Sequence, residues 1–536
     1  MKRFARLVAM VLIFACLSVC LLACDLGGKT NSNNTNTNSN HSTDTDDGGS
    51  TEPEVRDPSL PEIMDFGTDG EPYLYKALVR TGVDGAKESD QLVWGNNGYA
   101  CIDFYVGEDG SRADAISYAV YHRNSRIQDD YNCRIKQESQ NGDMTSQLKL
   151  AYMDSEKFDL TIIMAKAAAN AATQNLLTNL KDMSHLDLTH PAYDENSIKE
   201  LAIGDYLYYL SGDMNVSTME VCGPTIVNLE MYNDYIDTFV QLFKDPSFSN
   251  IYSLVQNKKW TIDTMLTMAN AINVDVDDSD DQLLGSQPGD VVGYFAYTGM
   301  GVYYYYGSGA RLSEHNDEGI PELVFQKQKN VDLYNYLFTK FNTNTGDNAA
   351  WLPHGLSGVR QDIFFSGRCL FTEMTLFDVR KTLYEAEPFQ YGILPNPTYE
   401  ANSDYHSVVY FTNCNHLWAI PSMVNDAEVA ALMMNIFAAY SNVELKDSTM
   451  YAYYERTLYL NTASDEGSRA AMNIIKNSMV YDIALLYDWS DLGRIMLGEL
   501  TVGELSTHTA NVKNANSITK YRLAPTIEKF KNPTMS

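Results

Sequence analysis

Phe158-Asp159-Leu160-Thr161-Ile162-Ile163-Met164 is the stretch of sequence that decides the fold. It is short, largely apolar and rich in β-branched residues, which is typical of a strand buried on both faces of a parallel sheet. Residues 165–180 follow at once and open on small side chains, so we expect a helix there that packs on the sheet.

The sequence before this stretch alternates between strand and helix patterns. Residues 99–106 alternate in polarity and end at Gly107, which predicts a strand. Residues 115–131 carry one apolar helical face, a second strand is expected to start at Arg134, and residues 145–153 can form a helix. This β-α-β-α-β order predicts a lobe with a parallel sheet, whose ligand-facing loops lie at the carboxyl ends of the strands.

Two later helices have recognisable starts. Thr261 is placed to cap a helix that carries apolar residues up to Ile272. Asn425 and Glu428 match the spacing of a capping pair before the helix that begins near Val429.

Length and charge limit the classes of protein to consider. About 480 residues follow Pro61, which is too many for one ordinary core and suggests two lobes or more. The net charge is −31, and about −34 after removal of the N-terminal cations Lys2, Arg3 and Arg6. Such a surface repels nucleic acid and anionic lipid and suits a neutral or cationic ligand.

The N-terminus has the pattern of an export signal. After its cations, residues 7–22 are apolar apart from Ser18, a length that suits a signal peptide better than a membrane span of about 30 Å. Leu21-Leu22-Ala23-Cys24 then matches a lipobox. The resemblance to lipoproteins implies diacylglyceryl transfer to the Cys24 thiol, palmitate-type acylation and removal of residues 1–23. The alternative is an ordinary secretory signal in which Cys24 has no special role.

The segment after Cys24 is expected to be a tether. Residues 28–54 contain no Ala, Val, Leu, Ile, Met, Phe, Tyr or Trp, and Asn, Thr, Ser, Asp and Gly dominate. Such a chain has nothing to bury and cannot offset its ordering entropy. We therefore expect residues 24–70 to join a lipid anchor on the outer face of a cell membrane to a folded body.

No motif for metal binding or nucleophilic catalysis stands out. Outside Cys24 the mature chain has five cysteines without a CxxC pair, so buried thiols are favoured over disulfides. Asp275 to Asp281 faintly resembles a calcium loop, but Asp280 stands where the turn glycine should be. The sequence implies no cofactor and no metal.

Several segments together resemble the extracellular solute-binding proteins of ABC sugar importers, the group typified by maltose-binding protein, and in particular a larger lipoprotein branch of that group. The segments are Tyr121 to Asn124, Phe158 to Leu160, Asn175 to Leu180, Gly204 to Tyr208, Lys259 to Thr261, Phe364 to Phe371, Tyr391 to Pro397 and Ala452 to Glu455. Their order matches the family and they cover most of residues 99–490. Each segment alone is a weak indication of the family. Together they are fairly specific for the superfamily and much less specific for the identity of the ligand.

The resemblance implies an α/β, two-lobed fold of the periplasmic-binding-protein type, with a cleft between the lobes. Lobe one would comprise residues 71–222 plus 413–445, and lobe two residues 223–412 plus 446–536. The chain would cross between lobes near Met219 to Pro224 and near Phe411 to Asn415.

The resemblance also implies where a sugar would bind. A pyranose ring needs an aromatic plate against its C–H face and polar groups at its edge. Related proteins place the plate after a Gly-x-x-x-x-Phe strand, which here leads from Gly367 to Phe377. We predict that Phe377 is the plate and Glu373 an edge acceptor; the alternative for Phe377 is packing against the following helix.

Four other residues are candidate ligand contacts. Lys166 follows the buried strand, and Glu220 lies in the first expected crossover. Trp351 and Trp489 lie in expected loops and could form plates at the cleft rim, whereas Trp418 is expected in the core. Of Tyr303 to Tyr306, we expect two to pack and two to face solvent or the cleft.

These features predict a non-catalytic, monomeric binding subunit that captures a sugar or oligosaccharide and delivers it to ABC permease subunits. A surface glycoside hydrolase would need a pair of carboxylates about 5–10 Å apart, and no motif favours one. A peptide-binding protein or a surface sensor of the same fold remains a third alternative.

Overall fold

The computed structural model describes residues 56–80, 94–95, 98–99, 103–104, 115–140, 143–276, 289–297, 301–341, 350–352, 362–383, 389–410, 415–459, 466–489 and 505–531. The predicted signal peptide, Cys24, most of the predicted tether and the acidic loop from residue 277 onward lie outside these ranges. Within the described ranges no helix is both long enough and apolar enough to cross a membrane.

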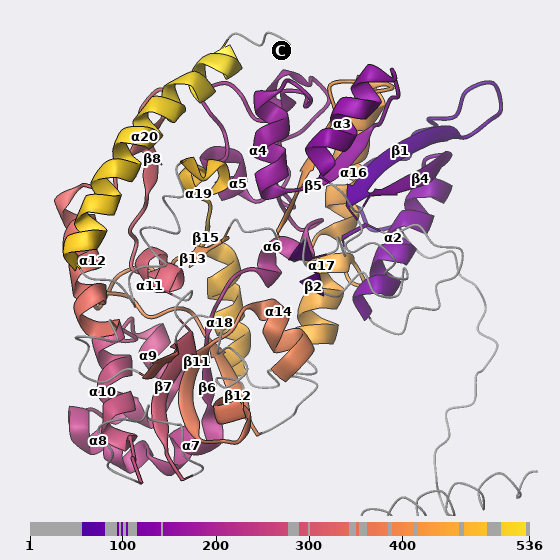
Figure 1. Ribbon diagram of the computed structural model, residues 1–536. Coiled ribbons are helices and arrows are strands. Elements are labelled where there is room, and N and C mark those ends of the chain that lie inside the picture. The colour runs from indigo at the N-terminus through magenta and orange to yellow at the C-terminus, as the bar shows by residue number, and fades with distance from the viewer. Residues whose placement is uncertain are drawn as a thin grey trace, which may run out of the picture. The chain divides into compact units, whose positions relative to one another are not determined.

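The first sheet is built around a strand that sequence reasoning missed. Its order is β14-β5-β1-β4, and the strands are β1 Tyr73–Arg80, β4 Cys133–Gln140, β5 Leu160–Met164 and β14 His416–Ala419. β1 pairs in parallel with both β4 and β5, and β14 is antiparallel to β5. The parallel β5 and the strand near Arg134 confirm two predictions (Figure 1).

Of the described residues Tyr99, Asp103 and Phe104, the strand predicted over residues 99–106 is confirmed only at Tyr99, which ends the two-residue strand β3 (Gly98–Tyr99). Asp103 and Phe104 lie outside any strand, and β1 takes the central place instead. The side chain of Phe104 packs in the core, where its ring centroid lies 5.9 Å from that of Trp418 and 5.4 Å from that of Phe437. In β1, Lys76 and Arg80 interrupt the apolar pattern and conceal a buried strand from sequence analysis.

Helices cover this sheet. Tyr75 of β1 and Trp418 of β14 both meet Phe437 of α16 (Ala427–Ser441), so α16 covers one face. α2 (Ala115–Asp130) joins it through a hydrogen bond of 3.0 Å from Arg123 to Ser441. α3 (Met144–Met153) and α4 (Ala165–Thr173) contact each other, and α4 packs on β5 and β14.

Two helix boundaries differ from those predicted. α4 ends at Thr173 rather than Leu180, because Asn175 adopts a left-handed φ of 58° and the chain then bonds to the segment after β14. The cap of α16 is Asp426 rather than Asn425: its carboxylate accepts from the backbone N–H groups of Glu428 and Val429. The Thr261 cap is confirmed, since its Oγ1 accepts from the N–H of Thr264 at 3.1 Å.

The second sheet is mixed. Its order is β10-β7-β11-β6-β12, with β6 Thr225–Asn228, β7 Val292–Tyr297, β10 Ala350–Leu352, β11 Cys369–Glu373 and β12 Tyr391–Leu394. β7 is parallel to β10 and β11, whereas β6 is antiparallel to β11 and β12. α10 (Ile262–Ile272) lies so close to β7 that a Cβ on Gly293 would come within 2.0 Å of the Ala269 carbonyl oxygen, which explains the glycine.

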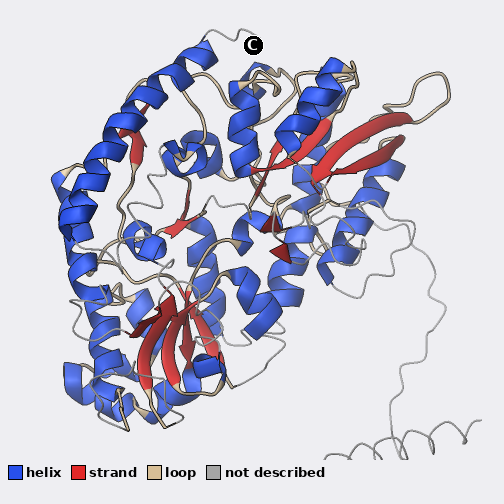
Figure 2. Cartoon of the chain, in the orientation of Figure 1, coloured by secondary structure: helices blue, strands red, loops and turns tan. Residues whose placement is uncertain are grey.

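The remaining elements complete the described chain (Figure 2). They are β2 Trp94–Gly95, β3 Gly98–Tyr99, η2 Leu180–Asp182, α5 Glu195–Glu200, α6 Val216–Glu220, α7 Leu229–Asp234, α8 Ile236–Phe243, η3 Pro246–Ser249, α9 Ile251–Gln256, α11 Gly301–Gly307, β8 Ser313–His315, β9 Pro321–Leu323, α12 Gln328–Phe341, α14 Leu376–Asp378, η5 Val379–Leu383, β13 Ser407–Val408, α17 Thr449–Tyr451, η6 Ala452–Tyr459, α18 Glu466–Asn477, β15 Met479–Val480, α19 Ile483–Tyr487 and α20 Leu505–Lys531.

The C-terminal elements contact both sheet-bearing regions. α18 packs on β12 and α9, beside the second sheet. α19 and α20 pack instead on α4, beside the first sheet. Tyr487 and Tyr209 share a hydrogen bond of 2.9 Å, and Phe530 of α20 meets Tyr208 at 5.0 Å. The chain therefore returns to the first sheet after α18.

The four consecutive tyrosines of α11 are all buried, each no more than 2% exposed, so none of them faces solvent, against the expectation that two face solvent or cleft. Partners distant in sequence surround the helix: Tyr304 reaches Glu373, and Tyr306 donates to Asp482 at 2.8 Å. Trp418 is buried as expected, and so are Cys133, Cys222 and Cys369, which are free thiols.

Candidate functional site

A five-residue helix, α6, stands at the first expected crossover, and every one of its residues is buried. Just before it, the Asn215 side chain donates to the carbonyl of His416. Ser217 Oγ lies 2.8 Å from the Asp103 carboxylate, and the Ser217 N–H donates to that same group at 3.2 Å. Burial raises the pKa of Asp103 to about 7, against the opposing effect of these Ser217 bonds.

An ion pair lies at the other end of α6. The Arg380 guanidinium of η5 donates to Glu220, and their side chains are only 6% and 5% exposed. The same guanidinium lies over the ring of Phe377, 5.5 Å from its centroid. A cation, a carboxylate and an aromatic face are thus gathered in one buried cluster beside α6.

The carboxyl edge of the first sheet brings further polar groups to α6. His416 pairs with Met164 at the end of β5, and the carbonyl of Asn415 accepts from the N–H of Ala165 at 3.0 Å. Arg80, the last residue of β1, is 1% exposed. Burial, together with the positive charge of Arg80, lowers the pKa of His416 to about 3. Ligands of α/β proteins bind outside such strand ends.

The structure brings two of the predicted contacts together. Phe377 and Glu220 both meet Arg380, which sequence reasoning did not single out. Phe377 is 9% exposed and does not belong to the continuous apolar core of the described chain, whereas its neighbours Leu376 and Val379 do. Its assignment as the sugar plate stays a prediction.

Glu373 is placed elsewhere, inside the second sheet. It is fully buried and accepts from the hydroxyls of Tyr294, at 2.5 Å, and of Tyr304. Burial raises its pKa to about 8. Its role as an edge acceptor stays a prediction, and a ligand would have to compete with two tyrosines for it.

The other three candidates lie apart from this cluster. Lys166 is 57% exposed at its side chain and pairs with Asp488 at 3.4 Å. Trp489 is 4% exposed, stacks on Tyr487 at 5.1 Å and donates to Thr526 of α20. Trp351 lies in strand β10, opposite Ala296, and not in a loop.

Several site residues escaped sequence reasoning, namely Arg80, Asp103, Arg380, Asn415 and His416. Their shared signal is a charged, amide or imidazole side chain next to an apolar run, as in Cys101-Ile102-Asp103-Phe104. Such residues are rarely buried unless they are paired. A polar residue that interrupts an apolar run was therefore the sequence feature that could have identified them as site residues.

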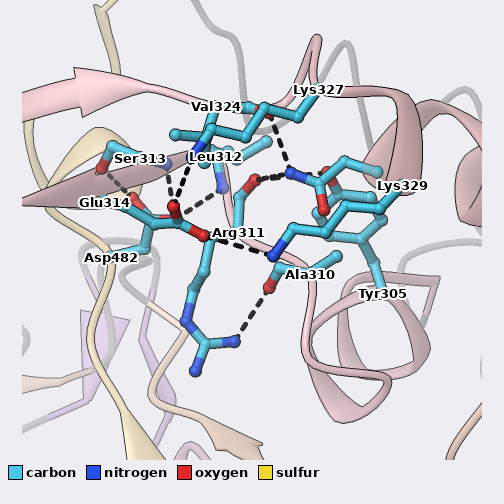
Figure 3. Close-up of polar contacts among 11 residues, drawn as sticks. Tyr305, Ala310, Arg311, Leu312, Ser313, Glu314, Val324, Lys327, Lys329 and Asp482 are labelled. Carbon is cyan, nitrogen blue, oxygen red and sulfur yellow. Dashed lines mark hydrogen bonds and ion pairs between the residues drawn. The ribbon is translucent and has the colours of Figure 1, made fainter.

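Two other polar features lie outside the Glu220–Arg380–Phe377 cluster. A pocket of about 330 Å³ lies against Thr218 and Met219 of α6, with Asp213 on its wall paired to Lys476 at 2.9 Å. Figure 3 shows Asp482, whose carboxylate accepts from Ser313 and from the N–H of Leu312. That carboxylate caps α19 and also binds the segment after α11, so its role is structural.

No group of three His, Cys, Asp or Glu side chains suited to a metal ion occurs among the residues that the structure describes.

Comparisons with known proteins identify the fold. No protein-family profile and no curated protein sequence matches the chain. Many solved structures match the chain, and the three described next each cover 85% of it at low sequence identity.

The first is the galacto-N-biose-/lacto-N-biose I-binding protein of the ABC transporter from Bifidobacterium longum in complex with lacto-N-biose, with 8% identity, 99% of that chain covered and a TM-score of 0.52. The second is the cyclic α-maltosyl-1,6-maltose binding protein from Arthrobacter globiformis, with 10% identity, 100% covered and a TM-score of 0.51. The third is an extracellular solute-binding protein from Staphylococcus aureus in complex with maltose, with 10% identity, 98% covered and a TM-score of 0.51. The chain therefore shares the α/β fold of maltose-binding-protein-like solute-binding proteins.

Proposed function

We propose that this chain is the substrate-binding subunit of an ABC importer, which captures a sugar or oligosaccharide outside the cell without altering it. The observation that carries the proposal is the match of 85% of the chain to binding proteins solved with sugars, over nearly their whole length. The buried polar cluster around α6 supports it, because it lies where the strand ends of the first sheet meet the expected crossover.

The cluster has the chemistry that a pyranose needs. Phe377 offers an apolar ring, and Glu220 and Arg380 offer an acceptor and a donor within one short stretch of the fold. The hydroxyls of a sugar can use both kinds of group, while the C–H face of the ring packs on the aromatic plate. The positive charge of Arg380 and the negative charge of Glu220 compensate each other, so this pair has no net charge, which suits a neutral ligand.

We place the two lobes as the family resemblance implies, with one modification. Lobe one comprises residues 71–222 plus 413–445, and lobe two begins at residue 223. The contacts of α19 and α20 with α4 favour joining the chain after Met479 to lobe one, rather than leaving all of 446–536 in lobe two. Opening the cleft would then carry α19 and α20 along with α4.

The chain would work at the outer face of the cell membrane. Acylated Cys24 would be the anchor, residues 24–70 the tether, and ABC permease subunits the partners that receive the ligand from the monomeric binding protein. The lipobox pattern and the polar composition of residues 28–54 support this arrangement.

A thermal-shift screen tests the function. The panel contains maltose, lacto-N-biose, cyclic maltosyl-maltose and longer glucans, with di- and oligopeptides as the alternative class. A ligand that binds only the folded chain stabilises it by about 2.7 kcal/mol at a hundredfold excess over Kd. Shifts with peptides and none with glycans would overturn the sugar assignment, and release of reducing ends would favour a glycoside hydrolase.

A further inference from the structure

Three polar side chains near α6 are fully buried and have no hydrogen-bond partner within the described part of the chain. They are Asn415, through both amide atoms, His416, through both ring nitrogens, and Tyr453, through its hydroxyl. Burying such groups unpaired costs free energy, so most buried polar groups in folded proteins are satisfied. Three of them in one region indicate that their partner comes from outside the chain.

All three belong to the cluster around α6. The backbone of His416 accepts from Asn215, whose neighbour Ser217 binds Asp103. Tyr453 of η6 lies close enough to Glu220 and Arg380 for their charges to act on its hydroxyl. The three groups therefore come from two separate stretches of the sequence, residues 415–416 and Tyr453, and lie where the chain is expected to cross between lobes.

The three groups are uncharged under physiological conditions. Burial lowers the pKa of His416 to about 3, and burial also holds the pKa of Tyr453 well above its usual value. An amide, a neutral imidazole and a phenol each offer donors and acceptors without a formal charge. A ligand hydroxyl, which also donates and accepts, complements them.

We propose that Asn415, His416 and Tyr453 hydrogen-bond to hydroxyl groups of the bound sugar and select for neutral, fully hydroxylated ligands. This inference rests on the proposed function. Binding proteins of this fold open and close by hinge motion between their lobes, and opening is what gives a ligand access to side chains buried at the crossover. A site built to bond a hydroxyl discriminates strongly against an analogue that lacks it, because the buried groups of the site are then left unpaired.

The substitution Tyr453→Phe tests the proposal with two readouts on the full chain. The probe is whichever of maltose, lacto-N-biose and cyclic maltosyl-maltose shifts the melting temperature of the wild type most. Because the hydroxyl has no partner in the protein, its removal should leave the melting temperature unchanged or raised. Loss of one bond to the ligand should raise Kd about 2- to 12-fold.

Tyr232→Phe is the matched control. Its hydroxyl donates to the Phe248 carbonyl at 2.7 Å, on α7 and away from α6. This variant should lose melting temperature and keep the wild-type Kd. If Tyr453→Phe instead behaves like Tyr232→Phe, the hydroxyl has a structural partner and the proposal is overturned.

His416→Leu provides an independent check on the strand side of the cluster. It should weaken binding of the same probe by a similar factor without lowering the melting temperature, and the wild-type Kd should not change between pH 5 and 8. Unchanged affinity in both the His416 and Tyr453 variants would overturn the inference while leaving sugar binding itself intact. A wild type that binds none of the probes would overturn the proposed function and the inference together.

Discussion

At the scale of single residues, the site depends on how buried charges are compensated. Glu220 and Arg380 are both nearly inaccessible, so each relies on the other in place of water. Removing one partner of such a pair leaves an uncompensated buried charge, which destabilises a protein far more than the loss of an exposed pair does. Phe377 completes this cluster through its contact with the guanidinium.

Arg380→Met should lower the free energy of unfolding by about 3–5 kcal/mol, because Glu220 is then buried without a counter-charge. Urea denaturation measures the change. Lys258→Met is the control: Lys258 pairs with Asp404 at 2.6 Å, but the two side chains are 42% and 81% exposed, and such pairs contribute about 0–1 kcal/mol. Equal, small losses in the two variants would show that the Arg380 pair is not buried in solution.

Phe377→Ala should weaken sugar binding by roughly 1–3 kcal/mol, about 5- to 150-fold, if the ring is the plate. Phe371→Ala is the matched control, because Phe371 is fully buried in β11 against Trp260. That variant should lose about 3–5 kcal/mol of stability from the cavity it creates. Calorimetric titration and thermal melts decide between plate and core: an unstable Phe377 variant with wild-type affinity would contradict the plate assignment.

At the scale of elements, the ends of helices show where local pattern and local structure agree. Thr261 caps α10 as its sequence predicts, whereas the cap of α16 is displaced by one residue. Asn425, the predicted cap, instead donates from its amide to the Tyr73 hydroxyl at 3.0 Å. Asn425 and Asp426 therefore have different roles: Asp426 caps the helix that follows it, whereas Asn425 joins two segments that are distant in the sequence.

Asp426→Ala should cost about 0.5–2 kcal/mol of stability, since two N–H groups at the start of α16 lose their acceptor. Asn425→Ala, one position earlier, removes only the partly exposed bond to Tyr73 and should cost less. Chemical denaturation of both variants measures the difference. If Asn425→Ala loses more stability than Asp426→Ala, Asn425 is the cap, as the sequence pattern predicts.

At the scale of the whole molecule, the formal charge of −31 overstates the charge of the folded chain. Glu373, Asp103 and Glu200 have pKa values raised to about 8, 7 and 7, in each case mainly by burial. These carboxyls are partly protonated near neutral pH, although an unfolded chain would ionise them fully. Folding is thereby linked to pH.

Stability should fall as the pH rises from 6.5 to 8. In this window the folded chain still holds protons that the unfolded chain lost near pH 4, so a rising pH favours unfolding, by at most about 1.4 kcal/mol per pH unit for each such carboxyl. His416 and His406, whose pKa values are lowered to about 3 and 4, act in the opposite sense only below pH 6.5. Urea midpoints across the window measure the slope, and Glu373→Gln should reduce it. A stability that is constant or rises with pH would contradict the assignment.

Cys24→Ala tests the anchoring of the whole chain. One acyl chain binds a membrane only marginally, and two bind it stably, so loss of the proposed acylation site should release the protein into the medium or leave it as unprocessed precursor. Membrane fractionation and mass spectrometry of the N-terminus provide the measurement. A variant that still fractionates as a mature, acylated protein would show that the lipobox assignment is wrong.

The sequence by itself determined the elements whose signal is local. The buried strand β5, the strand that begins near Arg134, and the helices α2, α3 and α10 follow from apolar periodicity and from caps a few residues away. The α/β class follows from their order. Periodicity and capping depend on neighbours in the chain, which a sequence shows directly.

Only the tertiary structure decided which strand is central and which polar residues share a site. β1 owes its place to partners on both sides, and its charged residues conceal it from pattern analysis. Arg380 meets Glu220 across 160 residues, and the four tyrosines of α11 are buried by segments as distant as Asp482. Burial and pairing of this kind depend on long-range contacts, whose partners the local sequence does not specify.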